Sequence, residues 1–169
     1  MIPGGDNDVL IGTTNSGIYH YNGEELKPWE VSVNEAIKDQ QIYTGILLPD
    51  KQIAIGTIQN GLFVIDLDGN IVLHINRNSG LQNNTVLSLF LDRYSNLWLG
   101  LDNGIDALEI SSPYSLLNYY YNIESSYASI VYDDKLYIGT NQGLFAKKIT
   151  DVKNQFLFDE KFKMLEGTK

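Results

Sequence analysis

A short pattern repeats four times along the chain, and this repetition constrains the fold more than any other feature. The copies are VLIGTTNSGIYHY at 9–21, IAIGTIQNGLFVI at 53–65, LWLGLDNGIDAL at 97–108 and LYIGTNQGLFAK at 136–147. Their leading glycines recur every 44, 44 and 39 residues, at Gly12, Gly56, Gly100 and Gly139. Because self-similarity at one period marks a repeat architecture, we predict a repeat protein.

Each copy has the local chemistry of two strands joined by a tight turn. Apolar and β-branched residues lead into the first glycine, and a second apolar run follows a turn of the type Asn-Ser-Gly or Asp-Asn-Gly. Asn-Gly pairs tolerate positive φ at both central positions of a hairpin turn. Residues 33–42 are the only weak helical candidate.

The rest of one period adds two more strands, at 70–76 and 85–92. Four short antiparallel strands in about 40–45 residues are the signature of a β-propeller blade. The segments 85–91 and 96–101 are apolar on both faces, as strands between two neighbouring sheets would be. The sequence therefore predicts an all-β partial propeller of about four four-stranded antiparallel blades, at approximately 1–33, 34–76, 77–122 and 123–169.

Residues 76–110 resemble the two-component regulator propeller repeat. The matching positions are Gly80-Leu81, Val86, Ser88, Asp92, Asn96, Leu97-Trp98, Gly100 and Gly104. Leu101 departs from the pattern where Thr is usual, and Tyr94-Ser95 replaces the turn glycine. The other three copies match mainly through Ile-Gly-Thr and Gly-Leu, so the resemblance covers nearly the whole chain.

This resemblance implies the periplasmic sensor region of a hybrid two-component histidine kinase of the Bacteroidetes. It implies oligosaccharide recognition, signal relay to a kinase that this chain lacks, and membrane attachment only through segments absent from this chain. It implies no catalytic activity and no cofactor, and it does not identify ligand-binding residues. The alternative is a structural or protein-interaction β-propeller without a small-molecule ligand.

The amino-acid composition narrows the kinds of partner and site that the chain can have. The net charge is −9, with 12 basic and 21 acidic residues, so a nucleic acid is not expected as a partner. No apolar run reaches the roughly 18–20 residues that span a bilayer, and no export signal is visible at the N-terminus. The chain contains no cysteine, which removes disulfides, thiolate metal sites and thiol nucleophiles.

Three motifs suggest ligand chemistry but fit turns or strands better. GTTNSG at 12–17 has the glycine spacing of a phosphate loop, yet Ile18-Tyr19 follow it where Lys and Ser/Thr should stand. DLDGN at 66–70 lacks the frame and distal Glu of a calcium loop. His20 and His74 fall in different repeats, so no zinc site can be assembled from them, and we expect no metal site.

Several other residues receive a structural interpretation. Tyr119 to Tyr121 and Trp98 are predicted to pack between blades, whereas Trp29 is the better candidate for an exposed aromatic that contacts a ligand. Asp50-Lys51 and Asp133-Asp134 are predicted to form solvated turns between the first and second strands of their blades.

The ends of the chain predict association. We expect the first blade to lack an inner strand before 8–13 and the last outer strand to lie near 156–162, so that the chain is a fragment of a larger ring. An open arc exposes one apolar blade face at each end, and such faces are association surfaces. We therefore expect self-association, for example a homodimer that closes an eight-bladed ring; a closed four-bladed ring is the competing geometry.

Overall fold

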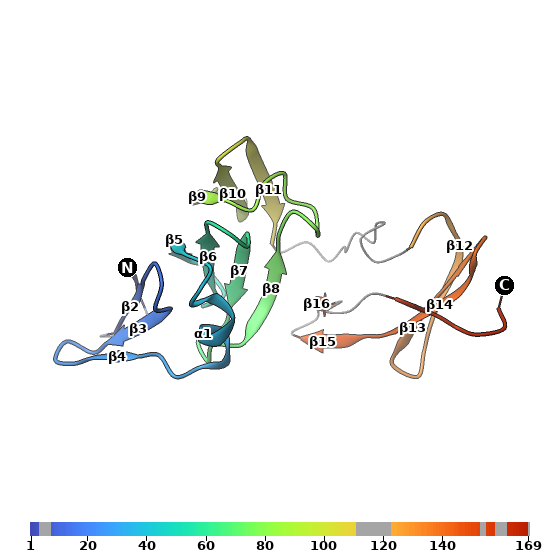
Figure 1. Ribbon diagram of the computed structural model, residues 1–169, viewed down its shortest axis with the longest axis horizontal. Helices are drawn as coiled ribbons and strands as arrows, with labels where there is room; N and C mark the ends of the chain where they lie inside the picture. The colour runs from blue at the N-terminus through green and yellow to red at the C-terminus, as the bar shows by residue number, and fades with distance from the viewer. Residues whose placement is uncertain (4–7, 111–122, 153–154, 158–161, 169) are drawn as a thin grey trace. The chain divides into compact units, whose positions relative to one another are not determined.

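The computed structural model describes residues 1–3, 8–110, 123–152, 155–157 and 162–168 (Figure 1). The chain divides into two compact units, Met1–Ser111 and Ser112–Lys169. Each unit is built from antiparallel sheets whose strands follow one another in the order of the sequence.

The first unit holds three sheets and one short helix, α1 (Ser32–Ile37). The first sheet has the order β1 (Ile2–Pro3), β2 (Val9–Gly12), β3 (Ile18–Tyr21) and β4 (Leu26–Pro28). The second has the order β5 (Ile42–Leu47), β6 (Ile53–Thr57), β7 (Leu62–Ile65) and β8 (Ile71–Ile75). The third contains β9 (Val86–Leu91), β10 (Asn96–Leu101) and β11 (Ile105–Glu109).

The second unit holds one four-stranded sheet and a small hairpin. The sheet has the order β12 (Ser126–Tyr132), β13 (Lys135–Thr140), β14 (Gly143–Lys148) and β17 (Lys163–Met164). The hairpin pairs β15 (Thr150–Val152) with β16 (Gln155–Leu157). Ile123, Ile138, Phe145 and Phe162 form a separate small core in this unit.

The predicted fold class is confirmed: the chain is all-β, with four antiparallel sheets that correspond to propeller blades. The four sheets lie within 1–33, 34–76, 77–122 and 123–169, while the exact blade limits stay a prediction. The weak helical pattern at 33–42 becomes α1, whose Val33 and Ile37 are fully buried.

One expectation about the ends was wrong. A two-residue inner strand, β1, does precede β2, because Ile2 and Pro3 pair with Leu10 and Val9. The last outer strand is β17, which begins directly after the predicted range 156–162, since Lys163 and Met164 pair with β14. The expected outer strand of the third blade, with Tyr119 to Tyr121, lies outside the described residues.

The three sheets of the first unit pack face to face in chain order. We call the face of a sheet that contacts the next sheet its forward face, and the opposite one its back face. The forward face of the first sheet shares a core with the back face of the second: Ile2, Leu10 and Ile18 pack with Ile53, Ile55, Phe63 and Ile65. The forward face of the second sheet packs in the same way on the back face of the third, through Ala54, Leu62, Val64, Leu97 and Leu99.

The leading glycines allow these sheets to approach closely. A Cβ on Gly12 would lie 2.7 Å from Cγ2 of Ile42, the first residue of β5. A Cβ on Gly56 would lie 2.6 Å from Cγ1 of Val86, the first residue of β9. The leading glycine of the first sheet and that of the second therefore each sit against the inner strand of the next sheet.

Candidate functional site

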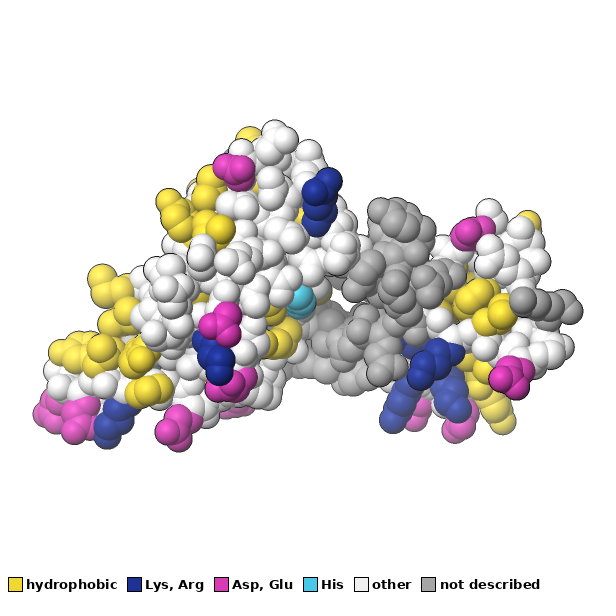
Figure 2. Space-filling view, viewed as in Figure 1, with side chains coloured by type: hydrophobic (Ala, Val, Ile, Leu, Met, Phe, Trp, Pro, Cys, Tyr) yellow, Lys and Arg dark blue, Asp and Glu magenta, His cyan; other side chains and the backbone are white. Residues whose placement is uncertain are grey.

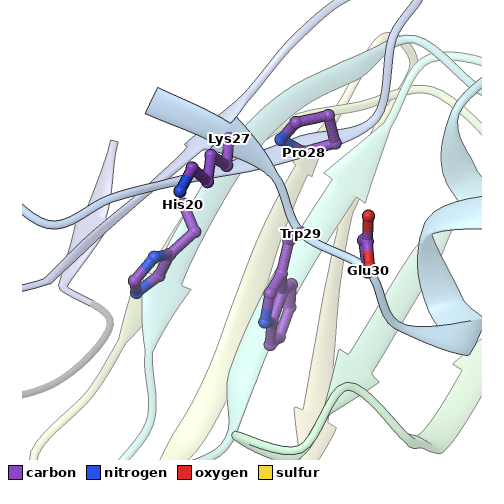
Figure 3. A pocket seen from close by; sticks show the side chains of 5 residues that line it. All are labelled: His20, Lys27, Pro28, Trp29 and Glu30. Carbon is purple, nitrogen blue, oxygen red and sulfur yellow. The ribbon is translucent and has the colours of Figure 1, made fainter. Parts of the chain in front are cut away.

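The best candidate site is a shallow hollow beside the first sheet. Its volume is about 450 Å³, and it is lined by His20, Lys27, Pro28, Trp29 and Glu30. His20 belongs to β3, whereas Lys27 and Pro28 end β4 and Trp29 and Glu30 follow it. The side chains of His20 and Trp29 extend in the same direction from these neighbouring segments (Figure 3).

Backbone hydrogen bonds hold the segment of Trp29 in place. The Trp29 amide donates to the Ile18 carbonyl at 3.0 Å. The Asn34 side chain, at the start of α1, donates from Nδ2 to the carbonyls of Trp29 at 2.9 Å and Ile18 at 3.0 Å. Asn34 Oδ1 in turn accepts the Ile18 amide at 2.6 Å. One amide side chain thus fixes both the strand and the segment that carries the indole.

The indole of Trp29 is half-buried, because it also packs against the core between the first and second sheets. A ring that is supported from below and exposed above presents a preorganised apolar surface. Trp29 was predicted to be the exposed aromatic that contacts a ligand, and its exposure was overestimated, because Trp29 is half-buried whereas Trp98 is 42% exposed. The contact itself stays a prediction.

Polar groups surround this ring. His20 Nε2 lies 3.0 Å from Asp8 Oδ2, and Lys27 Nζ lies 2.5 Å from Glu25 Oε2. Glu30 is exposed beside Trp29. An aromatic surface with hydrogen-bond donors and acceptors around it suits a small, polar, uncharged ligand. Sequence reasoning missed His20, Lys27 and Glu30; the signal was the pairing of His20 with Lys27 across β3 and β4, which only the register reveals.

Trp98 was predicted to be core, and this prediction was wrong. Its side chain is 42% exposed, on the forward face of the third sheet, where it pairs with Phe90 and Ala107. The Trp98 indole is held by Asp92, whose Oδ2 accepts a hydrogen bond from the indole Nε1 at 2.9 Å. That bond, with further amide donors from Asn96 and Tyr94, lowers the pKa of Asp92 to about 2.

The two histidines serve separate local contacts. His20 pairs with Asp8, while His74 stacks on Phe63 with ring centroids 4.0 Å apart and contacts the Asn60 carbonyl through Nε2 at 2.9 Å. Among the described residues, no group of three or more His, Asp or Glu side chains could hold a metal ion.

The DLDGN motif forms a turn between β7 and β8. Asp66 Oδ1 accepts the amides of Asp68 at 3.0 Å and Asn70 at 2.9 Å, and Gly69 adopts φ of 78°. The segment 92–96 repeats this geometry between β9 and β10, since Asp92 Oδ1 accepts the amides of Tyr94 and Asn96. These carboxylates are occupied by the turns themselves, which gives the motif a structural role.

The GTTNSG motif is the turn between β2 and β3, as predicted. Thr13 Oγ1 donates to the Gly17 carbonyl at 2.7 Å and accepts the Ser16 amide at 3.0 Å. Thr57 and Thr140 make the corresponding bonds in their own turns. Leu101 lacks the hydroxyl and keeps only the bond from its amide to the Gly104 carbonyl at 3.0 Å.

The other predicted turns also lie where expected. Lys51 closes the turn between β5 and β6 with φ of 57°, and its amide donates to the Leu48 carbonyl. Asp133 and Asp134 join β12 to β13 with φ of 49° and 54°.

One segment of the chain matches a known family model. Residues 80–103 match the family model described as two component regulator propeller. No curated protein matches the chain significantly.

Two solved structures are similar to the chain. One is the extracellular domain described as that of a hybrid two component system from B. thetaiotaomicron, with 22% identity and a TM-score of 0.57. The other is described as that of a one component system from the same organism, with 16% identity and a TM-score of 0.47. The similarities cover 89% and 96% of this chain but 20% and 23% of those chains. The chain thus spans about one fifth of their length.

Within the described part of the chain, the structure contains no helix with the length and hydropathy needed to cross a membrane.

Proposed function

We propose, from the premise that this chain carries a two component regulator propeller repeat, that it is part of the extracytoplasmic sensor region of a two-component signalling protein. The observation that carries the proposal is the match of residues 80–103 to that repeat, within a series of stacked propeller sheets. The similar solved structure is an extracellular domain from B. thetaiotaomicron, which supports a periplasmic location in a related bacterium.

In this function the chain binds and does not catalyse. Its contribution is recognition of an oligosaccharide, and a kinase outside these residues relays the signal. The hollow beside Trp29 supports this ligand class, because the indole offers an apolar face to a sugar ring and Lys27, His20 and Glu30 offer partners to its hydroxyls. A sugar is uncharged overall, so the net charge of −9 does not oppose its binding.

The experiment uses the tryptophan fluorescence of the 169-residue chain. Trp29 and Trp98 are its only tryptophans, so Trp98→Phe leaves Trp29 as the single reporter. A panel of plant and host oligosaccharides is titrated into this variant. One structural class of oligosaccharide is expected to shift the emission and to raise the melting temperature. Trp29→Ala, with Trp98 retained, is expected to abolish that rise.

A second candidate function is a protein-interaction propeller without a small-molecule ligand, and the large apolar side chains Phe90, Trp98 and Ile105 on one face of the third sheet favour it. The two functions are separated by the same panel. If no oligosaccharide of the panel changes the fluorescence or the melting temperature, oligosaccharide binding by this chain is overturned and the protein-interaction role is favoured.

A further inference from the structure

The hollow beside the first sheet carries more negative than positive charge. Of its lining residues, Lys27 and His20 are basic and Glu30 is acidic. Lys27 Nζ lies 2.5 Å from Glu25 Oε2. His20 Nε2 lies 3.0 Å from Asp8 Oδ2. Three carboxylates therefore accompany one ammonium and one imidazole, and the set is negative whether or not the imidazole is protonated. Figure 2 shows acidic side chains on both sides of a basic one along β4 and the segment that follows it.

Glu30 is the lining acid whose charge is not balanced. Its side chain is exposed and, among the described residues, takes part in no ion pair or hydrogen bond. Figure 3 shows it on one side of Trp29, with His20 on the other. The Val31 amide donates to the Trp29 carbonyl at 2.9 Å, so Glu30 is the central residue of a three-residue turn. This turn holds the unpaired carboxylate at the edge of the hollow, and all of these contacts lie within one compact unit.

The indole of Trp29 adds to the same preference. The face of an aromatic ring is the negative part of its quadrupole, so it attracts cations and repels anions. An anionic group on this ring would also meet the unpaired carboxylate of Glu30, while the nearby basic groups are already engaged with acidic partners. A neutral hydroxyl is not repelled, and it can donate to the carboxylate or accept from the ammonium. Specificity of this kind arises because an unpaired charge disfavours the wrong ligand.

We propose that Glu30 makes this hollow selective against acidic sugars, so that it takes neutral oligosaccharides and rejects those that carry uronic acid or sulfate groups. The sugar class rests on the proposed function, whereas the charge selectivity rests only on the residues around the hollow. An acidic sugar is expected to bind about fivefold or more weakly than its neutral counterpart at low salt. High salt should reduce this difference, because it screens exposed charges.

Charged fluorescence quenchers test the charge at the hollow without any sugar. In Trp98→Phe, Trp29 is the single tryptophan of the chain. Its emission is quenched by iodide or by caesium at constant ionic strength, and each efficiency is compared with that of the same quencher on free N-acetyltryptophanamide. Caesium is expected to have the higher relative efficiency. Adding Glu30→Gln should raise the efficiency of iodide and lower that of caesium.

Glu109→Gln, added to Trp98→Phe in the same way, is the matched control. It removes the same charge from an exposed position on β11, so both efficiencies should stay nearly unchanged. A higher relative efficiency of iodide in Trp98→Phe overturns the proposal. An equal effect of Glu30→Gln and Glu109→Gln also overturns it, because the net charge of the chain would then explain the preference.

Matched sugars test the selectivity itself. Oligosaccharides of glucose are paired with those of glucuronate, and oligosaccharides of galactose with those of galacturonate, at equal length and linkage. In a pair that binds, the neutral member should have the lower Kd, and Glu30→Gln should bring the two values together. Tighter binding of the acidic member, or a difference that Glu30→Gln leaves unchanged, overturns the selectivity while oligosaccharide binding stands. If the quenchers behave as expected and no pair binds, the charge selectivity of the hollow is supported and the proposed function is overturned.

Discussion

The indole Nε1 of Trp98 donates a hydrogen bond to Oδ2 of Asp92 at 2.9 Å. The same carboxylate closes the turn between β9 and β10, since Oδ1 accepts the amides of Tyr94 at 2.8 Å and Asn96 at 3.0 Å. Asp92 therefore couples the shape of this turn to the orientation of the indole on the forward face of the third sheet. A carboxylate that accepts several hydrogen bonds in its ionised form has a lowered pKa.

The first prediction concerns that pKa. Trp98→Phe removes the indole donor, the largest cause of the lowered value, so the pKa of Asp92 should rise from about 2 toward its ordinary value of 3.8. The measurement is an NMR titration of the side-chain carboxyl carbon. Tyr94→Phe is the control, because it keeps the backbone amide that Asp92 uses. An unchanged Asp92 pKa in Trp98→Phe would contradict the bond.

The second prediction concerns pH and stability. The folded-state pKa of Asp92 is about 2 and its ordinary value is 3.8, so the ionised carboxylate favours the folded state. That contribution is complete above pH 3.8 and is lost as the pH falls through about 2. Between pH 5 and pH 2 the melting temperature of the wild type should therefore fall further than that of Asp92→Asn. The melting temperatures are measured by tryptophan fluorescence. An equal fall in melting temperature for the two proteins between pH 5 and pH 2 would count against this role of Asp92.

The third prediction concerns the threonine of the repeat turn. The Thr57 side chain is fully buried, and its hydroxyl donates to the Gly61 carbonyl at 2.9 Å and accepts the Asn60 amide at 3.0 Å. Thr57→Val keeps the shape but leaves both backbone groups without this partner. The free energy of unfolding should fall by about 1–3 kcal/mol.

Urea denaturation followed by tryptophan fluorescence checks this, because Trp29 and Trp98 both lie in the same unit as Thr57. Thr13→Val is the matched comparison: Thr13 is only half-buried, so water can replace its hydroxyl and the loss should be smaller. Equal losses at the two positions would show that burial does not set the cost.

The sequence was sufficient to predict the four sheets, because the repeat aligns the same strand–turn–strand pattern at Gly12, Gly56, Gly100 and Gly139. It was less informative about turn conformation. Asn-Gly chemistry suggested positive φ at both central positions, yet in the repeat turns only the trailing glycines, such as Gly17 and Gly61, have it. Each of these turns is closed by a backbone bond to the trailing glycine, such as Thr13 N–H to the Gly17 carbonyl, and the turn of Leu101 shows that the threonine hydroxyl is not required.

The candidate site could be predicted only in part. Trp29 stood out in the sequence as an aromatic in a polar segment, but its polar neighbours depend on the register of β3 and β4. Trp98 was misjudged because its burial depends on what covers the forward face of the third sheet. A strand pattern specifies that a face is apolar, and it does not specify what that face contacts.

The last prediction tests the close approach between sheets. Gly56→Ala would bring a Cβ to 2.6 Å from Cγ1 of Val86 and 2.7 Å from Cγ2 of Thr44, distances that the packed sheets can accommodate only by shifting. Overpacking of this kind costs about 1–3 kcal/mol. Gly139→Ala is the matched control, because its Cβ would meet no heavy atom closer than 3.8 Å, and its effect should stay within about 0.5 kcal/mol.

A double-mutant cycle assigns the cost to the contact between sheets. Val86→Ala removes the atom nearest to the new Cβ, so Gly56→Ala should cost less in that background than in the wild type. Circular dichroism during urea denaturation follows all four proteins, since it detects both units. Strict additivity of the two changes would show that the cost of Gly56→Ala arises within its own sheet. It would also show that Gly56 does not determine how closely the next sheet packs.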